Sequence, residues 1–206
     1  MASVSGLVLA GGEGSRVGAF KALLSLGGQP LIIRPVEVLR AVSDEVLVAY
    51  GSREHGARLD RVVEDARLVG DEGLGPLGGL DRGAQAAQGE WLLVAPCDVP
   101  FLSPDLYRVL LRRAQRLDGC ILRRGDQDNL LIAAYRRNAL LQASALALGK
   151  GERAAQALLP HLRLARLGEA DLRGLPYGLQ STLDIDTLED LARAEGLLQE
   201  GPKTSD

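Results

Sequence analysis

The sequence predicts an α/β protein whose mostly parallel sheet is covered by helices on both faces. Short apolar runs alternate with helix-length amphipathic segments along most of the chain, which is the pattern of repeated βαβ units. Strands of a parallel sheet are buried on both faces and are therefore apolar almost throughout. In such sheets ligands bind beyond the carboxyl ends of the strands, so the loops that follow the strands are where a site is expected.

The first half of the chain supplies the expected elements in close succession. Residues 4–10 are an apolar run typical of a buried strand, and residues 45–50 are a second one. Between them, residues 31–41 carry the apolar stripe of a helix. A further helix is expected over residues 77–88 and a strand over residues 91–97. The segments that follow these three strands should therefore border a ligand site.

The second half continues with another helix and further strands. Ser103 is a suitable N-cap and Pro104 a suitable first helical residue, so a helix is expected to begin there. Residues 119–122 and 130–135 have the composition of strands. These elements continue the alternation of the first half.

The end of the chain predicts one more strand and a closing helix. We expect the strand over residues 179–185. Thr187 and Asp190 have the spacing of a capping box, and a helical apolar stripe follows them. Residues 199–206 are typical of a loose polar tail, so residues 1–198 are expected to form a single domain.

Composition excludes several classes of protein. With 206 residues, 46% hydrophobic and 25% charged, the chain is typical of a soluble globular protein and not of a disordered one. A net charge of -3 and 3% aromatic residues argue against a nucleic-acid partner. No window approaches the roughly 18 apolar residues of a membrane span, so we expect a cytoplasmic protein with no membrane partner. Cys97 and Cys120 form no C-x-x-C pair and are expected to be reduced and buried.

A glycine-rich segment follows the first strand directly, with four glycines between residues 11 and 18. Consecutive N–H groups in such a loop can cradle phosphate oxygens, because glycine leaves no side chain in the way. Arg16 and Lys21 add two cations, and Lys21 is one of only three lysines in the chain. An arginine fork and a lysine point charge suit a triphosphate, whereas a plain strand-to-helix turn is the alternative interpretation.

Carboxylates mark two further loops. Asp98 follows the strand over residues 91–97 and could hold Mg²⁺, which usually takes one or two carboxylates plus substrate phosphates; the alternative is an Asp that caps a turn. Asp184 and Asp186 have one residue between them, so they point to the same side of an extended segment. Asp186 is the second candidate metal ligand, and capping of the last helix is the alternative.

Other residues give weaker indications. The segment that starts at Asp71 leads into a helix at Pro76, where free N–H groups attract anions. Cys97 is interpreted as a packed residue, because no histidine close to it in sequence is available as a base. His55 and His161, the only histidines, are interpreted as ordinary core or surface residues.

Four segments together resemble the nucleotidyltransferase family that includes molybdenum cofactor guanylyltransferase: LVLAGGEGSRVGAFKALLSLGGQPLI, DEGLGPLGGL, APCDVPFLSPDL and DIDTLEDLA. The resemblance covers roughly the first 115 residues and returns at the last segment. It implies a three-layer, Rossmann-like nucleotidyltransferase fold and dependence on Mg²⁺. It also implies transfer of GMP from GTP to the terminal phosphate of molybdopterin with release of pyrophosphate, and it leaves room for transient contact with other molybdenum cofactor enzymes.

The resemblance also assigns roles to individual residues. It implies that the nucleotide is contacted by Leu9, Ala10, Gly11 and Gly12 and that its phosphates are bound by Arg16 and Lys21. It also implies that Asp71 and Gly78 line the nucleotide pocket and that Asp98 binds Mg²⁺. Arg16, Lys21 and Asp98 are the implied catalytic residues. The chain departs from the family pattern at Gly51 and its neighbours, and at Asp184 and Asp186, where the family more often has asparagines.

Two other functions fit the same residues. One is a related transferase that acts on another phosphate, such as adenosylcobinamide phosphate or a sugar phosphate. The other is a nucleotide-binding module without turnover. The presence of Arg16, Lys21 and Asp98 together argues against the second, because binding alone would not need all three.

Overall fold

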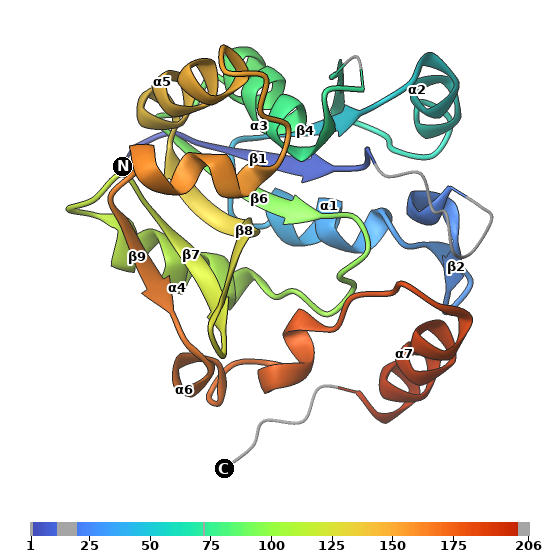
Figure 1. Cartoon of the computed structure of the whole chain (residues 1–206). Helices are drawn as coiled ribbons and strands as arrows, with labels where there is room; N and C mark the ends of the chain where they lie inside the picture. Colours follow the sequence, from blue (N-terminus) through green and yellow to red (C-terminus); the bar gives the residue numbers. More distant parts are fainter. Residues whose placement is uncertain (1, 12–19, 72, 202–206) are drawn as a thin grey trace.

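The computed structural model describes residues 2–11, 20–71 and 73–201, and within them a seven-stranded sheet forms the centre of the molecule (Figure 1). Its strands are arranged in the order β5-β4-β1-β6-β8-β7-β9. The bounds are β1 (Val4–Leu9), β4 (Glu45–Tyr50), β5 (Arg67–Gly70), β6 (Trp91–Pro96), β7 (Gly119–Arg124), β8 (Gln127–Arg136) and β9 (Leu164–Leu167). Only β8 runs against its neighbours, so the predicted mostly parallel sheet is confirmed.

Successive side chains along the strands pack alternately into two separate hydrophobic cores. In β1, Leu7 packs into the core on one face and Val8 into the core on the other. Likewise β6 sends Leu92 to the first face and Leu93 to the second. This period of two places apolar side chains on both faces of the sheet and makes two helical layers necessary.

Helices cover both faces of the sheet and make three layers (Figure 1). One face is covered by α1 (Ile33–Arg40) and α4 (Pro104–Ala114), and the other by α3 (Gly75–Ala86), α5 (Arg137–Leu148) and the 3₁₀ helix η2 (Ala155–His161). The Ser103 hydroxyl accepts the N–H of Leu106 at 3.3 Å, as predicted for the N-cap of α4. None of the helices in the described ranges is long and apolar enough to cross a membrane.

A smaller third core joins the two ends of the chain. The hairpin of β2 (Ser25–Leu26) and β3 (Gln29–Pro30) packs near α7 (Leu188–Glu200), and Leu26, Ile185 and Ala194 are buried between them. Thr187 and Asp190 form the predicted capping box of α7. The helix continues through Glu200, past the point where the loose tail was expected to begin.

The strand expected over residues 179–185 is wrong. The chain instead forms the 3₁₀ helix η3 (Gly178–Thr182), which is followed by irregular backbone. Tyr177 and Gly178 have φ values of 63° and 48°, which turn the chain out of an extended conformation. The hydroxyls of Ser181 and Thr182 then donate to carbonyls three residues back, and such local hydrogen bonds compete with pairing in a sheet.

Several elements, most of them short, had no clear sequence signal. They are the 3₁₀ helix η1 (Lys21–Leu23) and the helices α2 (Arg53–Leu59) and α6 (Glu169–Leu172), together with the strands β5 and β9 and the helix α5. Most of these elements span seven residues or fewer, and a periodic pattern needs a longer window to stand out. Cys97 and Cys120 are free and buried, as predicted.

Candidate active site

The carboxyl ends of three neighbouring strands form the floor of the site. Leu9, the last residue of β1, pairs with Ala49 of β4 on one side and with Pro96 of β6 on the other. The chain leaves the sheet at Gly11 after β1 and at Asp98 after β6. The loops that follow these strands therefore meet at one edge, as expected for a parallel sheet.

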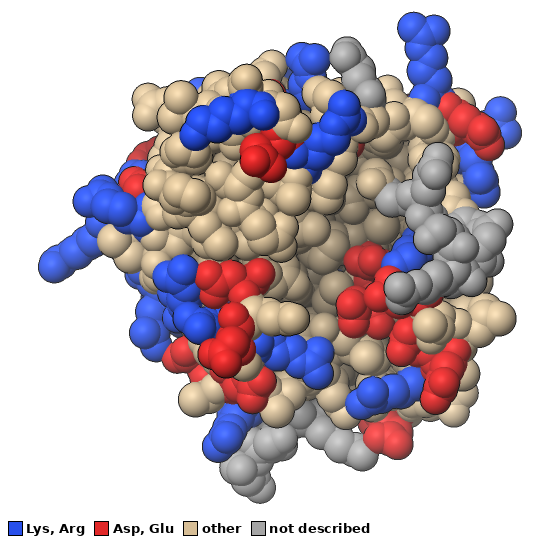
Figure 2. Space-filling model, viewed as in Figure 1, with Lys and Arg blue, Asp and Glu red and all other residues tan. Residues whose placement is uncertain are grey.

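A cavity of about 210 Å³ opens at this edge. The predicted site residues on its lining are Leu9, Gly11, Lys21, Asp71 and Asp98. The remaining lining residues are Gly75, Pro76, Gly79, Pro96, Cys97 and Leu131. Figure 2 shows a hollow on this face of the molecule, with acidic and basic side chains side by side on one rim.

Lys21 joins two carboxylates that are far apart in the sequence. Its ammonium nitrogen Nζ lies 3.3 Å from Oδ2 of Asp98 and also donates a hydrogen bond to Oδ1 of Asp186. The Lys21 side chain is only 16% exposed, whereas that of Asp186 is 47% exposed. One ammonium group therefore holds together the end of β6 and the segment that precedes α7.

The backbone keeps Asp186 within reach of Lys21. The N–H of Ile185 donates to the carbonyl of Asp98 at 2.9 Å, and the Ile185 side chain is buried in the third core. Asp184 and Asp186 flank Ile185 in the sequence, and neither is buried with it. Asp186 reaches Lys21, and Asp184 borders a second cavity described below.

Burial and charge act against each other in this cluster. Burial favours a lower pKa for Lys21, but the hydrogen bonds and charges of Asp186 and Asp98 outweigh it and hold the pKa above the ordinary value. Burial raises the pKa of Asp98 above its usual range; the ammonium of Lys21 opposes this rise in pKa and the nearby charge of Asp186 adds to it. At neutral pH Lys21 is therefore a fixed positive charge at the edge of the cavity.

Asp71 is a buried carboxylate surrounded by backbone. It is 3% exposed, its own N–H donates to the carbonyl of Tyr50 at 2.9 Å, and its Oδ1 accepts the N–H of Gly73 at 2.9 Å. Burial raises its pKa, and the Gly73 hydrogen bond offsets part of this. A Cβ atom on Gly11 would lie 3.0 Å from Oδ2 of Asp71, so the close approach at this point favours glycine.

The other predicted site residues have different surroundings. Ala10 is fully buried, and its N–H donates to the carbonyl of Ala49 at 2.8 Å. Gly78 packs against Leu74, whose Cβ would be 2.3 Å from a Cβ on Gly78, and it is Gly79 that lines the cavity. Gly12 and Arg16 lie outside the described residues.

Cys97 lines the cavity but is not equipped to act as a nucleophile. It is 7% exposed, and burial raises the pKa of its thiol far above the ordinary value. The neighbouring charge of Asp98 raises the thiol pKa further. Since the thiolate is the reactive form, the interpretation of Cys97 as a packed residue agrees with its surroundings.

The donor set suits a hard divalent cation only in part. No group of three or more His, Cys, Asp or Glu side chains in the described ranges is placed to hold a metal ion. Asp98 and Asp186, however, present carboxylate oxygens to the same ammonium group. Two carboxylates are a sufficient protein contribution for Mg²⁺, which completes its shell with waters and substrate phosphates.

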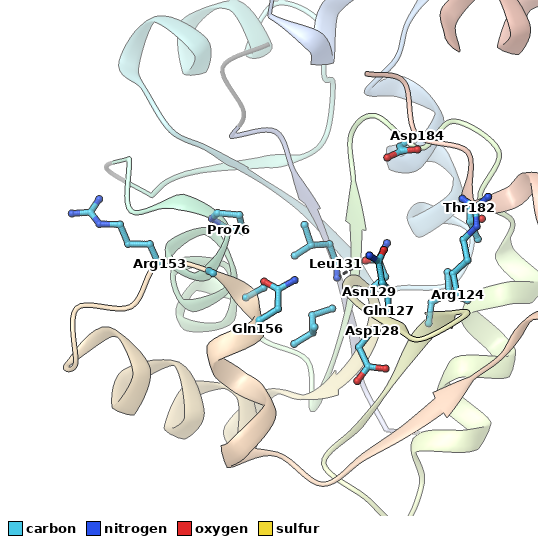
Figure 3. A pocket seen from close by; sticks show the side chains of 14 residues that line it. Pro76, Arg124, Gln127, Asp128, Asn129, Leu131, Arg153, Gln156, Thr182 and Asp184 are labelled. Carbon is cyan, nitrogen blue, oxygen red and sulfur yellow. Dashed lines mark hydrogen bonds between the residues drawn. The ribbon is translucent and has the colours of Figure 1, made fainter. Parts of the chain in front are cut away.

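A larger cavity of about 590 Å³ adjoins the first and shares Pro76 and Leu131 with it. Its other lining residues are Leu122, Arg124, Gln127, Asp128, Asn129, Leu130, Arg153, Ala154, Ala155, Gln156, Thr182 and Asp184. Figure 3 shows Arg124, Thr182 and Asp184 on one side and Pro76, Arg153 and Gln156 on the other, with residues of β8 between them. Its lining holds four uncharged polar side chains and four charged ones.

Among the residues that line this larger cavity, only Pro76 and Asp184 stand out in the sequence. The β7–β8 pairing is irregular between Ile121 and Leu122, and the side-chain oxygen of Asn129 accepts the N–H groups of Leu131 and Ile132 at 2.9 and 3.2 Å. This irregularity places the start of β8 at the cavity wall. Isolated amides such as Gln156 belong to no motif, so only the packed structure identifies them.

Curated relatives match this chain over nearly its whole length. A probable molybdenum cofactor guanylyltransferase from Pelotomaculum thermopropionicum is 32% identical over 195 residues, which cover 94% of this chain and 93% of that protein. A molybdenum cofactor guanylyltransferase from Desulfosudis oleivorans is 28% identical, with 98% of each chain covered. These similarities confirm the resemblance carried by the four motif segments.

A solved structure shows the same fold. The crystal structure of molybdopterin-guanine dinucleotide biosynthesis protein A from Archaeoglobus fulgidus superposes with a TM-score of 0.82 at 24% identity, covering 95% of this chain and 99% of that one. The family profile described as the MobA-like NTP transferase domain matches residues 6–167. Because this profile spans most of the sequence and the Pelotomaculum relative matches nearly end to end, the chain belongs to the MobA-like NTP transferase domain family.

Proposed function

We propose that this chain is a molybdenum cofactor guanylyltransferase, which transfers GMP from GTP to the phosphate of molybdopterin. The observation that carries the proposal is the cluster in which Lys21 joins Asp98 and Asp186 beside the buried carboxylate of Asp71. The names of the relatives that match the full chain support the choice of reaction. A binding module without turnover has no evident use for a buried lysine held between two carboxylates.

The reaction needs no covalent enzyme intermediate. A phosphate oxygen of the acceptor attacks the α-phosphorus of GTP, a new P–O bond forms, and the bond between the α-phosphorus and its bridging oxygen breaks. Pyrophosphate leaves with the electron pair of that bond. Positioning and charge stabilisation are sufficient to accelerate such a step.

In this proposal Lys21 and Arg16 bind the phosphates of GTP. The Lys21 ammonium stays protonated at neutral pH, because both of its carboxylate partners raise its pKa. When GTP binds, phosphate oxygens replace one or both carboxylates as the partners of this charge. Lys21 then stabilises the negative charge that gathers on the leaving pyrophosphate.

Asp98 and Asp186 would hold Mg²⁺. When bound, the ion would neutralise charge on the phosphates and orient them for attack. Lys21 donates to both carboxylates in the ligand-free chain, so a cation that binds there has to compete with the ammonium group. Nucleotide phosphates relieve this competition by drawing Lys21 away, which couples cation binding to nucleotide binding.

The base is proposed to be guanine. The carboxylate of Asp71 and the bare backbone of Gly11 and Gly79 border the cavity, and such groups can pair with the N1–H, N2–H and O6 pattern of guanine. Isothermal titration with GTP, ATP and CTP in the presence of Mg²⁺ tests the choice. We expect clear preference for GTP; equal affinity for all three would reject guanine and leave the phosphate site intact.

The acceptor is proposed to occupy the larger cavity. A volume of 590 Å³ lies within the usual range of small-molecule sites, roughly 300–1,000 Å³, and this cavity adjoins the phosphate-binding residues. Uncharged polar groups such as Gln127 and Gln156 suit the amide-like edges of a pterin.

The decisive experiment is a pyrophosphate-release assay over four nucleoside triphosphates, with and without molybdopterin. We expect release only with GTP and molybdopterin together. Release with GTP and a sugar phosphate, but not with molybdopterin, would identify a related transferase. Nucleotide binding without any release would identify a module that does not turn over.

A further inference from the structure

Phe20, the residue before Lys21, stacks flat against a histidine of another element. The rings of Phe20 and His55 are 3.9 Å apart between centroids and inclined by 3°. The guanidinium of Arg58 lies 5.6 Å from the centre of the Phe20 ring. Phe20 itself is 5% exposed and belongs to the core under α1 and α4.

The helix that carries His55 is fixed to the sheet. It is α2, which begins after β4 with the Ser52 hydroxyl accepting the N–H of His55 at 3.2 Å. A Cβ atom on Gly56 would lie 2.7 Å from the ring of Tyr50, so α2 sits directly on the last residue of β4. Leu59, at the end of α2, is fully buried. These contacts fix the position of His55, so its ring is a rigid surface for the Phe20 ring.

Phe20 also directly precedes Lys21, which forms the cluster with Asp98 and Asp186. Its carbonyl accepts the N–H of Leu23 at 3.0 Å, which closes the first turn of η1. Lys21 is the first residue of η1 and sends its side chain to Asp98 and Asp186. The ring contact of Phe20 and this hydrogen bond both hold the backbone from which the Lys21 side chain starts.

We infer that His55 is a positioning residue for the phosphate-binding site, acting through the Phe20 ring on the ammonium group of Lys21. The inference rests on the proposed function, since it assumes that Lys21 binds the phosphates of GTP. A lysine stem is long and flexible, so a fixed starting point lowers the number of places its charge can occupy. A charge that is held in place before the ligand arrives stabilises the ligand more than one that has to be ordered.

The test uses three variants of the full chain and two ligands. His55→Ala removes the ring, His55→Phe keeps a flat ring without nitrogen atoms, and His161→Ala is the matched control at the end of η2. GTP affinity is measured by isothermal titration and guanosine affinity by ligand-observed NMR. Thermal unfolding of each variant shows whether the fold is kept.

We expect His55→Ala to bind GTP roughly tenfold more weakly while guanosine affinity stays unchanged, because a misplaced lysine affects only the phosphates. His55→Phe should restore GTP affinity to within about twofold if the flat contact is what matters, and His161→Ala should match the wild type. A Phe20→Leu variant should lose GTP affinity to the same extent, and combining it with His55→Ala should add little further loss, since both act through one contact.

The inference is overturned if His55→Ala keeps wild-type GTP affinity, if it weakens GTP and guanosine equally, or if His55→Phe is no better than His55→Ala. Equal weakening of both ligands would indicate general loosening of the domain. Failure of the wild type to bind GTP would be a different result: it would reject the proposed function and this inference with it.

Discussion

The two adjoining cavities are built from different kinds of segments. The smaller one is lined by charged groups held in place by one another, with Lys21 joined to Asp98 and Asp186. The larger one mixes amides, a hydroxyl and apolar groups with the charged side chains of Arg124, Asp128, Arg153 and Asp184. Its wall includes an irregular hairpin and the end of a 3₁₀ helix. The charges proposed for phosphate chemistry therefore come from compact sequence motifs, whereas the shape proposed to select an acceptor comes from scattered positions.

The largest effect should come from Asp98. Asp98→Asn keeps the size of the side chain and removes its charge, so the loss of Mg²⁺ binding should cost on the order of 3 kcal/mol in the transition state, a hundredfold or more in turnover. Turnover against Mg²⁺ concentration and thermal stability are measured for Asp98→Asn and Asp186→Asn.

A folded Asp98→Asn protein with near-normal turnover and unchanged Mg²⁺ dependence would contradict the metal role and leave Asp98 as a turn residue. Loss in both variants would indicate two carboxylates around one ion. Loss in Asp98→Asn alone would assign Asp186 to pairing with Lys21.

Substitution of Lys21 should have the next largest effect on turnover. Lys21→Arg should lower turnover by roughly tenfold or more, because a wide planar guanidinium does not occupy the site of a compact ammonium. The matched control is Lys150→Ala, which should leave turnover unchanged, since Lys150 is exposed in the turn after α5. Wild-type activity in Lys21→Ala would exclude a phosphate role.

The same residue offers a test of the competition between ammonium and cation. Lys21→Met removes the group that now joins Asp98 and Asp186, so the nucleotide-free protein should bind Mn²⁺ more tightly than the wild type, by roughly tenfold if one unit charge is removed from the site. The measurement is electron paramagnetic resonance of free Mn²⁺ during titration. Equal Mn²⁺ affinity in the two proteins would show that Lys21 does not compete.

A smaller effect is expected in the larger cavity. Gln156→Ala removes one hydrogen-bonding group, worth about 1 kcal/mol or about fivefold, so KM for the acceptor should rise by that factor. KM for GTP should not change, because Gln156 lines only the larger of the two cavities. Gln199→Ala, on the exposed side of α7, serves as the control. A change in KM for GTP of the same size would contradict the division between the cavities.

The smallest effect should come from a pair far from both cavities. The carboxylate of Asp118 accepts hydrogen bonds from the backbone N–H of Arg163 at 2.8 Å and from its guanidinium Nε at 3.3 Å. Burial alone would raise the pKa of Asp118, but these contacts hold the pKa below its ordinary value. A lowered pKa adds stability above the unfolded value, near 3.9, and this stability is lost as the pH falls through the folded value. Because the Arg163 side chain is 76% exposed, Asp118→Asn should cost less than about 1 kcal/mol at pH 7.

Urea unfolding at pH 7 and at pH 3 measures this difference. The gap in unfolding free energy between wild type and Asp118→Asn should shrink at pH 3 and leave turnover at pH 7 unaffected. A gap of equal size at both pH values would mean that the carboxylate charge contributes nothing.

By itself the sequence determined the frame of the molecule and one half of the site. Strand and helix periods in residues 4–114 matched the longer elements β1, α1, β4, α3, β6 and α4 but not the short ones between them, since these signals depend on several side chains a few positions apart. The rule that parallel strands end at a common edge then brought Leu9, Lys21 and Asp98 together. Asp71 joined them through the loop after β5, a strand that was not predicted.

Only the tertiary structure decided which distant segments meet. The pairing of Lys21 with Asp186, the stack of Phe20 on His55 and the larger cavity all join residues from separate elements. The expected strand at residues 179–185 failed for the same reason: Ile185 is buried, and Leu183 partly buried, in a small core between the hairpin and α7 and not in the sheet, whereas Leu179 is exposed. Local periodicity indicates whether a segment is a helix or a strand, but not which other segment it packs against, because that depends on the packing of the whole chain.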